Sequence, residues 1–267
     1  MCTPDAAVLT LPFQGTWRAE LSPARRVPSH GTQLFATTYA IDFVAVRGRR
    51  SASTRDWRTM LATEPPDRFF AFGQPVLAPA DGRVVSVHEG EADHEARRSQ
   101  PALVSYALTQ AQRARGGPGA LAGNHIGLAR DGGGYVVLAH LRAGSVRVRV
   151  GERLATGDEV ARCGNSGNST QPHVHVQVMD APDPHTARGV PLAFRDYRVW
   201  PRAGGAAVEV ALGVPGEREV VEPSSGGASR GTGAAGRASR RWRPGRWSLE
   251  VPVGDRAGSR SDDGGAR

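Results

Sequence analysis

Two histidines separated by a single residue, His173 and His175, form the part of the sequence best suited to chemistry. Alternate residues of a β-strand point to the same face, so both imidazoles would project from one sheet surface at a spacing that suits a shared metal centre. Such pairs also arise by chance on strands, and the flank makes this pair more specific. The preceding residues 164–171 (GNSGNSTQ) are polar and glycine-rich, which is typical of a loop that delivers a strand to the rim of a groove.

Asp42 is a second candidate, because it is a carboxylate inside the apolar run 39–46 (YAIDFVAV). An unpaired carboxylate is costly to bury, so a buried Asp42 should have a cation or strong donors as its partner. The competing interpretation is an aspartate that faces solvent or an arginine, which is the usual case for a single Asp in a strand. With His175, Asp42 would supply two of the about three protein ligands that a catalytic zinc needs beside an open position for water.

The segments that would position these side chains are short and rich in β-branched residues. Besides residues 39–46, the patterns predict strands over four runs: residues 83–88, 135–140, 145–150 and 173–179. Gly, Pro, Asp and Asn separate the runs at short spacing, which favours a mainly β fold with antiparallel strands. Residues 91–115 differ because they lack glycine, and we expect an insertion at about residues 91–118 that is partly helical.

The composition indicates one folded core followed by a basic tail. Of the 267 residues 39% are hydrophobic, and 34 glycines and 19 prolines favour turns over long helices. We expect a folded domain over residues 1–202 and a Gly/Ser/Arg-rich, largely disordered tail over residues 203–267. The net charge of +8 comes from arginines alone, without lysine. Such a charge can attract nucleic acid or a cell wall, but we interpret the arginines mainly as solvated and expect no specific nucleic acid partner.

The cysteines and the N-terminus exclude several classes of protein. Cys2 and Cys163 form no Cys-x-x-Cys motif, so a metal would be held by histidines and carboxylates. The first residues lack a basic region and a sustained apolar stretch, so no signal peptide is expected and the sequence alone favours the cytoplasm. No run approaches the roughly 20 apolar residues that cross a bilayer, so no membrane span is expected. The sequence leaves the oligomeric state open.

Four segments, in this order, resemble the M23 (lysostaphin-like) metallopeptidases. They are residues 39–43 (YAIDF), 73–84 (GQPVLAPADGRV), 138–141 (LAHL, with VG at 150–151 and GD at 157–158) and 164–175 (GNSGNSTQPHVH). The resemblance implies an antiparallel β-sheet domain of the lysostaphin-like peptidase type with a groove across one sheet. It also implies zinc-dependent hydrolysis of peptide bonds in peptidoglycan, at the cell envelope or outside the cell.

The resemblance further implies roles for individual residues. Asp42 and His175 correspond to metal ligands, and His140 and His173 would stand beside the nucleophilic water, which they would orient or deprotonate, or they would stabilise the oxyanion. No serine or cysteine nucleophile is required by such chemistry.

The first metal ligand departs from the family pattern. The pattern has a histidine four residues before the aspartate, and here that position is Thr38, which is a poor zinc ligand. The nearest upstream histidine is His30, twelve residues before Asp42, and a loop of that length can return it to the end of the strand. We therefore predict one Zn²⁺ per chain, held by His30, Asp42 and His175.

Two rival interpretations remain from the sequence. One is a degenerate, non-catalytic binding or regulatory module that keeps the M23-like fold without the metal, and Thr38 favours it. The retention of all four of Asp42, His140, His173 and His175 argues against it, because an inactive site has no chemical need for them. The other is a nucleic-acid-binding protein, whose affinity would depend steeply on salt.

Overall fold

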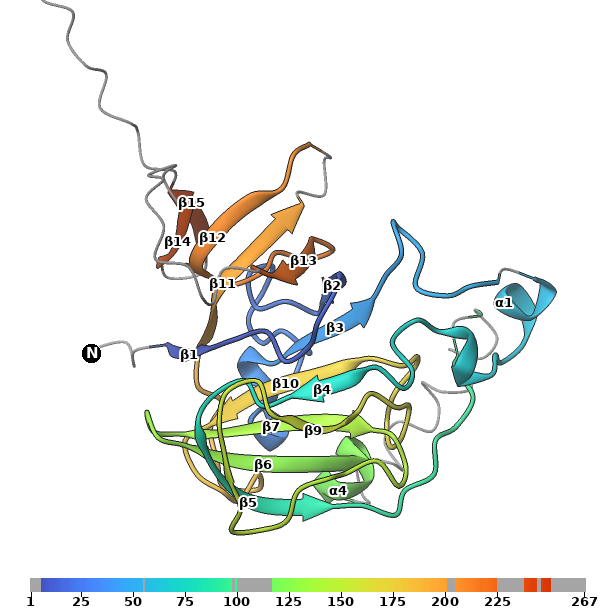
Figure 1. The fold of residues 1–267 in the computed structure, drawn as a ribbon, viewed down its shortest axis with the longest axis horizontal. Coiled ribbons are helices and arrows are strands. Elements are labelled where there is room, and N and C mark those ends of the chain that lie inside the picture. Colours follow the sequence, from blue (N-terminus) through green and yellow to red (C-terminus); the bar gives the residue numbers. More distant parts are fainter. Residues whose placement is uncertain are drawn as a thin grey trace, which may run out of the picture.

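Short strands make up most of the described chain, which in this computed structural model comprises residues 6–54, 56–97, 99, 117–200, 205–224, 238–243 and 246–250 (Figure 1). The strands are β1 (Ala7–Leu9), β2 (Trp17–Glu20), β3 (Ile41–Ala45), β4 (Pro75–Leu77), β5 (Gly82–His88), β6 (Asn124–Arg130), β7 (Tyr135–Leu141), β8 (Arg153–Leu154), β9 (Glu159–Arg162), β10 (Val174–Met179), β11 (Leu192–Trp200), β12 (Val208–Gly213), β13 (Val220–Pro223), β14 (Ala238–Arg243) and β15 (Arg246–Glu250). The helical elements are short: a 3₁₀ segment η1 (Leu34–Tyr39), α1 (Trp57–Leu61), η2 (Pro66–Arg68) and α4 (Gly117–Ala122).

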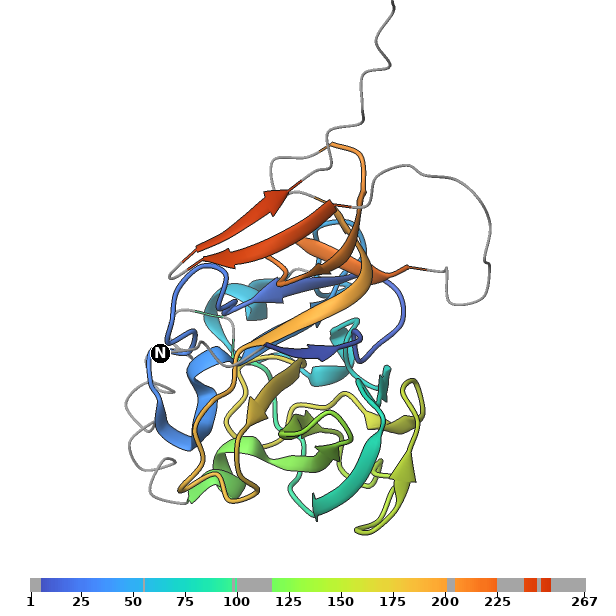
Figure 2. The ribbon, with the colours of Figure 1, turned by 90° about the vertical axis from the view of Figure 1, so that its left-hand side faces the viewer.

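One large sheet carries almost all of these strands. Its order is β15-β14-β12-β11-β13-β2-β3-β10-β7-β6-β5-β8, and β1 pairs with β11. The pairings are antiparallel except for β1 with β11 and β12 with β14. Strands β11 to β15 gather at one end of the molecule and β5, β6 and β7 at the other (Figure 1, Figure 2). The expectation of a mainly β, mostly antiparallel fold is therefore confirmed.

The alternation of side chains in the central strands separates a core face from a face with polar groups. In β10, Val174, Val176 and Val178 belong to the hydrophobic core, and in β3 the core residues are Ile41, Phe43 and Ala45. The small antiparallel pair of β4 and β9 adds Val76, Val160 and Ala161 to the same core. Because neighbouring residues of a strand point to opposite faces, the residues between these core positions project to the other side of the sheet.

The end of the folded region lies beyond the expected boundary at residue 202. Strand β12 pairs with β11, and β13 joins β11 to β2. Val210, Val214 and Val221 are buried in the core. The stretch from Val208 onward contains enough apolar side chains to form two strands that pack on that core. Residues 205–224 therefore do not belong to a disordered tail, and we propose that the domain extends at least to Pro223. Residues 225–237, 244–245 and 251–267 lie outside the described residues.

Residues 145–150 and the expected insertion are two further segments for which the sequence made a prediction. Residues 145–150, predicted as a strand from their strict alternation, do not join a ladder, although Arg147 donates its backbone N–H to Val160 O at 2.9 Å. Val146 and Val148 nonetheless pack against the core. The alternation of valines and polar residues here therefore reflects which side chains face the core and does not indicate strand pairing. The helical part of the expected insertion falls mostly on residues 98 and 100–116, which lie outside the described residues.

Within the described part of the chain, no helix is long and apolar enough to span a membrane.

Candidate metal centre

Strand register brings Asp42 and His175 together. The two residues stand directly opposite each other in the antiparallel pair of β3 and β10, and both side chains leave the face away from the core. His175 Nδ1 lies 2.9 Å from Asp42 Oδ1, and both residues are buried. The carboxylate in the apolar run thus has a partner 133 positions away along the chain.

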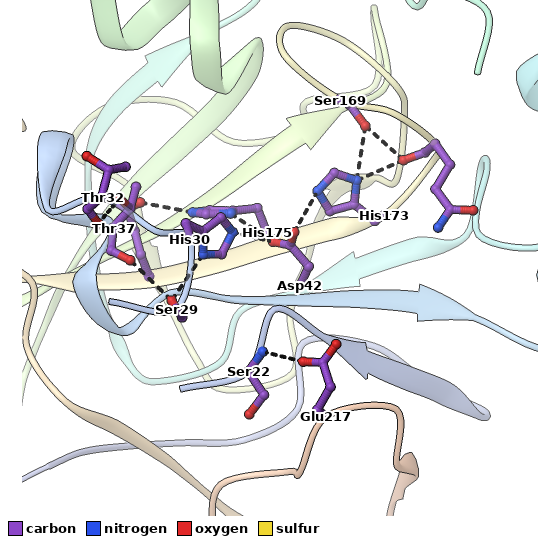
Figure 3. Close-up of polar contacts among 12 residues, drawn as sticks. Ser22, Ser29, His30, Thr32, Thr37, Asp42, Ser169, His173, His175 and Glu217 are labelled. Atoms are coloured by element: carbon purple, nitrogen blue, oxygen red, sulfur yellow. Dashed lines mark hydrogen bonds and ion pairs between the residues drawn. The ribbon is translucent and has the colours of Figure 1, made fainter. Parts of the chain in front are cut away.

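His30 reaches the same carboxylate from a loop. Ser29 closes this loop by donating its backbone N–H to Thr38 O at 3.0 Å and its hydroxyl to Thr37 O at 3.3 Å. His30 Nε2 then lies 3.3 Å from Asp42 Oδ1, and His30 Nδ1 lies 3.1 Å from Ser29 Oγ (Figure 3). One potential ligand atom from each of His30, Asp42 and His175 falls within 4.8 Å of the others, which is the set expected from the sequence.

His140 and His173 stand beside this group. Their ring centroids are 4.5 Å apart, and His173 Nε2 is 3.5 Å from Asp42 Oδ2. The ring of His140 is 5.9 Å from that of His175. The structure therefore brings together all five residues singled out from the sequence; their roles in binding and catalysis remain a proposal.

The hydrogen-bond partners of His140 and His173 indicate which ring nitrogen of each histidine carries the hydrogen. His140 Nδ1 lies 2.9 Å from Ser166 O, and His173 Nδ1 lies 2.8 Å from Gln171 O. A backbone carbonyl only accepts hydrogen bonds, so each Nδ1 must be the donor. In the neutral imidazoles the inner nitrogen, Nε2, is consequently bare and free to accept a proton.

The same reasoning applies to the two candidate ligands. The Ser29 hydroxyl, which donates to Thr37 O, accepts from His30 Nδ1–H, so His30 Nε2 is bare. His175 Nε2 faces Gln177 Oε1 at 2.9 Å and is the donor there, which leaves Nδ1 bare toward Asp42. The lone pairs of His30 Nε2 and His175 Nδ1 then face the carboxylate of Asp42. Because these groups repel one another, a cation or extra protons must lie between them. Two imidazole nitrogens and one carboxylate oxygen are a donor set that zinc accepts, so the residues fit a metal ion.

The charges of these groups shift their protonation. Burial alone would raise the pKa of Asp42, but the nearby imidazoles of His173 and His30 hold that pKa well below its usual value, as do the contacts of His175 and His30 with Asp42, which become hydrogen bonds when those rings are protonated. Burial, together with His173 and His175, pushes the pKa of His140 well below its usual value. Burial also lowers the pKa of His175, but the hydrogen bond that a protonated Nδ1 would donate to Asp42 and the charge of that carboxylate outweigh burial and raise the pKa.

A cavity of about 560 Å³ opens over the cluster. Its walls are mostly apolar, with Leu34 and Phe35 of η1 and Pro182 and Pro184 of a following loop among them. Among the described residues that line it there is no arginine or glutamate, and Asp42 is the one acidic side chain. The space beside the cluster thus suits an extended, uncharged segment of a ligand.

Sequence reasoning missed two groups that support the site. Asp93 accepts from Asn165 N–H at 2.6 Å and from Ala143 N–H at 3.1 Å, and so fastens the loop that precedes His173. Gln177 contacts His175, and its position two residues later on the same strand face was a signal that could have found it. No local pattern pointed to Asp93.

The chain is thus a mainly β protein whose sheet carries, on one face, a group of residues that could hold a metal ion. Residues 67–187 match the sequence model of peptidase family M23, which confirms the family resemblance. The matched range includes His140, His173 and His175 and begins after His30 and Asp42. This match supports a peptidase.

Solved structures of M23 peptidases are similar to the chain at low identity. The catalytic domain of the antimicrobial peptidase lysostaphin from Staphylococcus simulans is 20% identical, with 57% of this chain and 74% of that chain covered and a TM-score of 0.32. The catalytic domain of the prophage-encoded M23 protein EnpA from Enterococcus faecalis is 20% identical, with 55% and 85% covered and a TM-score of 0.31. No curated protein matches the chain.

Proposed function

We propose that this protein is a zinc-dependent endopeptidase whose metal is held by His30, Asp42 and His175. The observation that carries the proposal is the convergence of bare nitrogens of His30 and His175 on Asp42 Oδ1, at 3.3 Å and 2.9 Å. The lone pairs of this cluster oppose one another unless a cation or extra protons lie between them, and two imidazole nitrogens with a carboxylate oxygen are a donor set that zinc accepts. The M23 match supports a peptidase as the class of enzyme.

Zinc bound at this centre would polarise the scissile carbonyl and lower the pKa of a bound water towards about 7. The protein's own part of the chemistry falls to His140 and His173. Each keeps its Nδ1–H on a backbone carbonyl and presents a bare Nε2, so one can take the proton of the attacking water. The histidine that has taken this proton can then donate it to the leaving amine. If the other takes up a proton from solvent at its Nε2, it can donate to the oxyanion. The low pKa of His140 keeps it neutral near pH 7, as a proton acceptor must be.

The proposed substrate is a peptide of peptidoglycan, by analogy with the family. The apolar, largely uncharged walls of the cavity support a neutral stretch of peptide at the scissile bond. A cell-wall substrate also places the protein at the cell envelope or outside the cell, and this location is part of the proposal.

The direct test is zinc content and peptide cleavage in wild type, Asp42→Asn and His30→Ala. We expect about one zinc per chain in wild type, and in either variant a loss of zinc affinity exceeding the roughly 10–100-fold typical of outer-shell changes. His88→Ala is a matched control, because His88 is a histidine outside the cluster and should leave zinc unchanged. Wild type that takes up no zinc after supplementation would sink the proposal.

A second candidate function is a non-catalytic M23-like binding module. The observation that favours it is Thr38, which occupies the position of the family's first histidine ligand. This candidate predicts a protein that binds peptidoglycan fragments without cleaving them and without zinc. Cleavage that a chelator abolishes and zinc restores would exclude it.

A further inference from the structure

Gln177 is a buried polar residue behind the proposed metal ligands. It lies in β10 two residues after His175, so both side chains project from the same sheet face, and it is 6% exposed. A neutral amide buried at this depth needs partners for both of its ends. Gln177 has them, and the two partners lie on different parts of the site.

The first step is the orientation of the amide. Gln177 Nε2 donates to Phe35 O at 2.9 Å, and a backbone carbonyl can only accept. The nitrogen end therefore must face Phe35, which leaves Oε1 to face His175. Oε1 lies 2.9 Å from His175 Nε2, and because this oxygen only accepts, His175 Nε2 must carry hydrogen.

The second step concerns the other nitrogen of His175. With the hydrogen of the neutral ring on Nε2, Nδ1 presents its lone pair 2.9 Å from Asp42 Oδ1, ready to bind a metal ion beside that carboxylate. Without an acceptor behind Nε2, the neutral ring would gain by moving its hydrogen to Nδ1 and donating to Asp42. The ligand and the carboxylate would then be bonded to each other, and the metal would have to break that bond.

The third step links Gln177 to the loop of His30. Phe35 belongs to η1, in which Phe35 and Ala36 take left-handed backbone conformations at φ 54° and 61°. Such conformations are unfavourable for residues with a side chain and need support from their surroundings. The bond from Gln177 to Phe35 O supports this segment, which connects His30 with β3.

We propose that Gln177 is a positioning residue for the metal, because it holds His175 in the Nε2–H tautomer and braces the segment between His30 and Asp42. This inference rests on the proposed function for its metal, but the tautomer is a property of the metal-free chain.

Two variants of Gln177 distinguish the effect of its hydrogen-bond acceptor from the effect of its side-chain size. Gln177→Met keeps the length of the side chain and removes the acceptor, and we expect its zinc affinity to fall about 10–100-fold, measured by competition with a chromophoric chelator. Gln177→Glu keeps an acceptor for His175 Nε2–H but loses the donor to Phe35 O, so we expect its zinc affinity to fall less than that of Gln177→Met. Equal zinc affinity in wild type and Gln177→Met would overturn the inference.

Nitrogen-15 NMR of the metal-free protein, at a pH where the imidazoles are neutral, reads the tautomer directly. We expect Nε2–H for His175 in wild type and Gln177→Glu, and Nδ1–H in Gln177→Met. Nδ1–H in wild type would overturn the inference without any variant, even if Gln177→Met does not fold. Wild type that shows Nε2–H but binds no zinc would contradict the proposed function and leave the role of Gln177 in setting the tautomer standing.

Discussion

His140 occupies a left-handed backbone conformation, at φ 60°, and its Nδ1 lies 2.9 Å from Ser166 O. A residue with a side chain pays about 1–2 kcal/mol for this conformation. The break in the regular backbone of β7 turns the imidazole toward His173, whose ring centroid is 4.5 Å away. Backbone strain and a defined ring orientation therefore coincide at a residue proposed to transfer protons.

The strain at His140 predicts a difference between two substitutions. His140→Ala and His140→Gly should both lower peptide cleavage by about 10²–10⁴-fold while retaining zinc, because each removes a proton acceptor and leaves the three proposed ligands in place. His140→Gly should be more stable than His140→Ala by about 1 kcal/mol, because glycine adopts positive φ freely. Chemical denaturation and elemental analysis of both proteins check this. Equal stability of the two variants would contradict the strain.

The low pKa of His140 predicts a pH-dependent stability of the metal-free protein. The unfolded chain binds a proton on this histidine near its ordinary pKa of about 6.5, whereas the folded protein resists it because of burial and the neighbouring His173 and His175. Below about pH 6.5 the unfolded state therefore binds more protons, and the contribution of His140 to stability decreases as the pH falls.

The raised pKa of His175 has the opposite effect, because it stabilises the folded protein at lower pH. This direct contribution of His175 is common to wild type and His140→Ala, so the difference between their unfolding free energies isolates the contribution of His140. The difference should be constant above about pH 7 and shrink as the pH falls below 6.5. Urea titrations in the presence of a chelator measure it. A difference that is independent of pH between 5 and 8 would refute the prediction.

Cys163 is expected to be an inert packing residue. It is fully buried, and burial together with nearby Asp93 raises the pKa of its thiol well above the usual value. In a Cys2→Ala background, Cys163 should react with a thiol reagent at neutral pH only after denaturant is added, because the thiolate is the reactive form. Cys163→Ala should retain cleavage activity and lose about 1 kcal/mol of stability. Rapid labelling of the native protein would show that this part of the core opens.

Thr38 should not substitute for His30 as a ligand. A Cβ atom placed on Gly189 would lie 3.0 Å from Thr38 Cβ, so the side chain of Thr38 starts against Gly189, whereas Thr37 lines the cavity. The double variant His30→Ala, Thr38→His restores the histidine of the family pattern but should remain as poor in zinc as His30→Ala alone. Elemental analysis decides this, and recovery of one zinc per chain would mean that the loop can rearrange.

The sequence by itself determined the strands and the chemical types at the site. Alternation along the strands at residues 39–46 and 173–179 separates core residues such as Phe43 and Val176 from Asp42 and His175, because a strand repeats every two residues whatever it pairs with. Family resemblance added His140 and His173. The same periodicity was misleading in residues 145–150, where Val146 and Val148 are partly buried but the segment has no partner strand.

Only the tertiary structure decided how these groups meet. The register of β3 against β10 sets Asp42 opposite His175, and closure of a loop by Ser29 and Thr38 brings His30 to the same point. The contact of Gln177 with Phe35 likewise joins positions 142 residues apart. Such relationships depend on hydrogen bonds between distant segments, and local periodicity carries no information about which distant segments will pair.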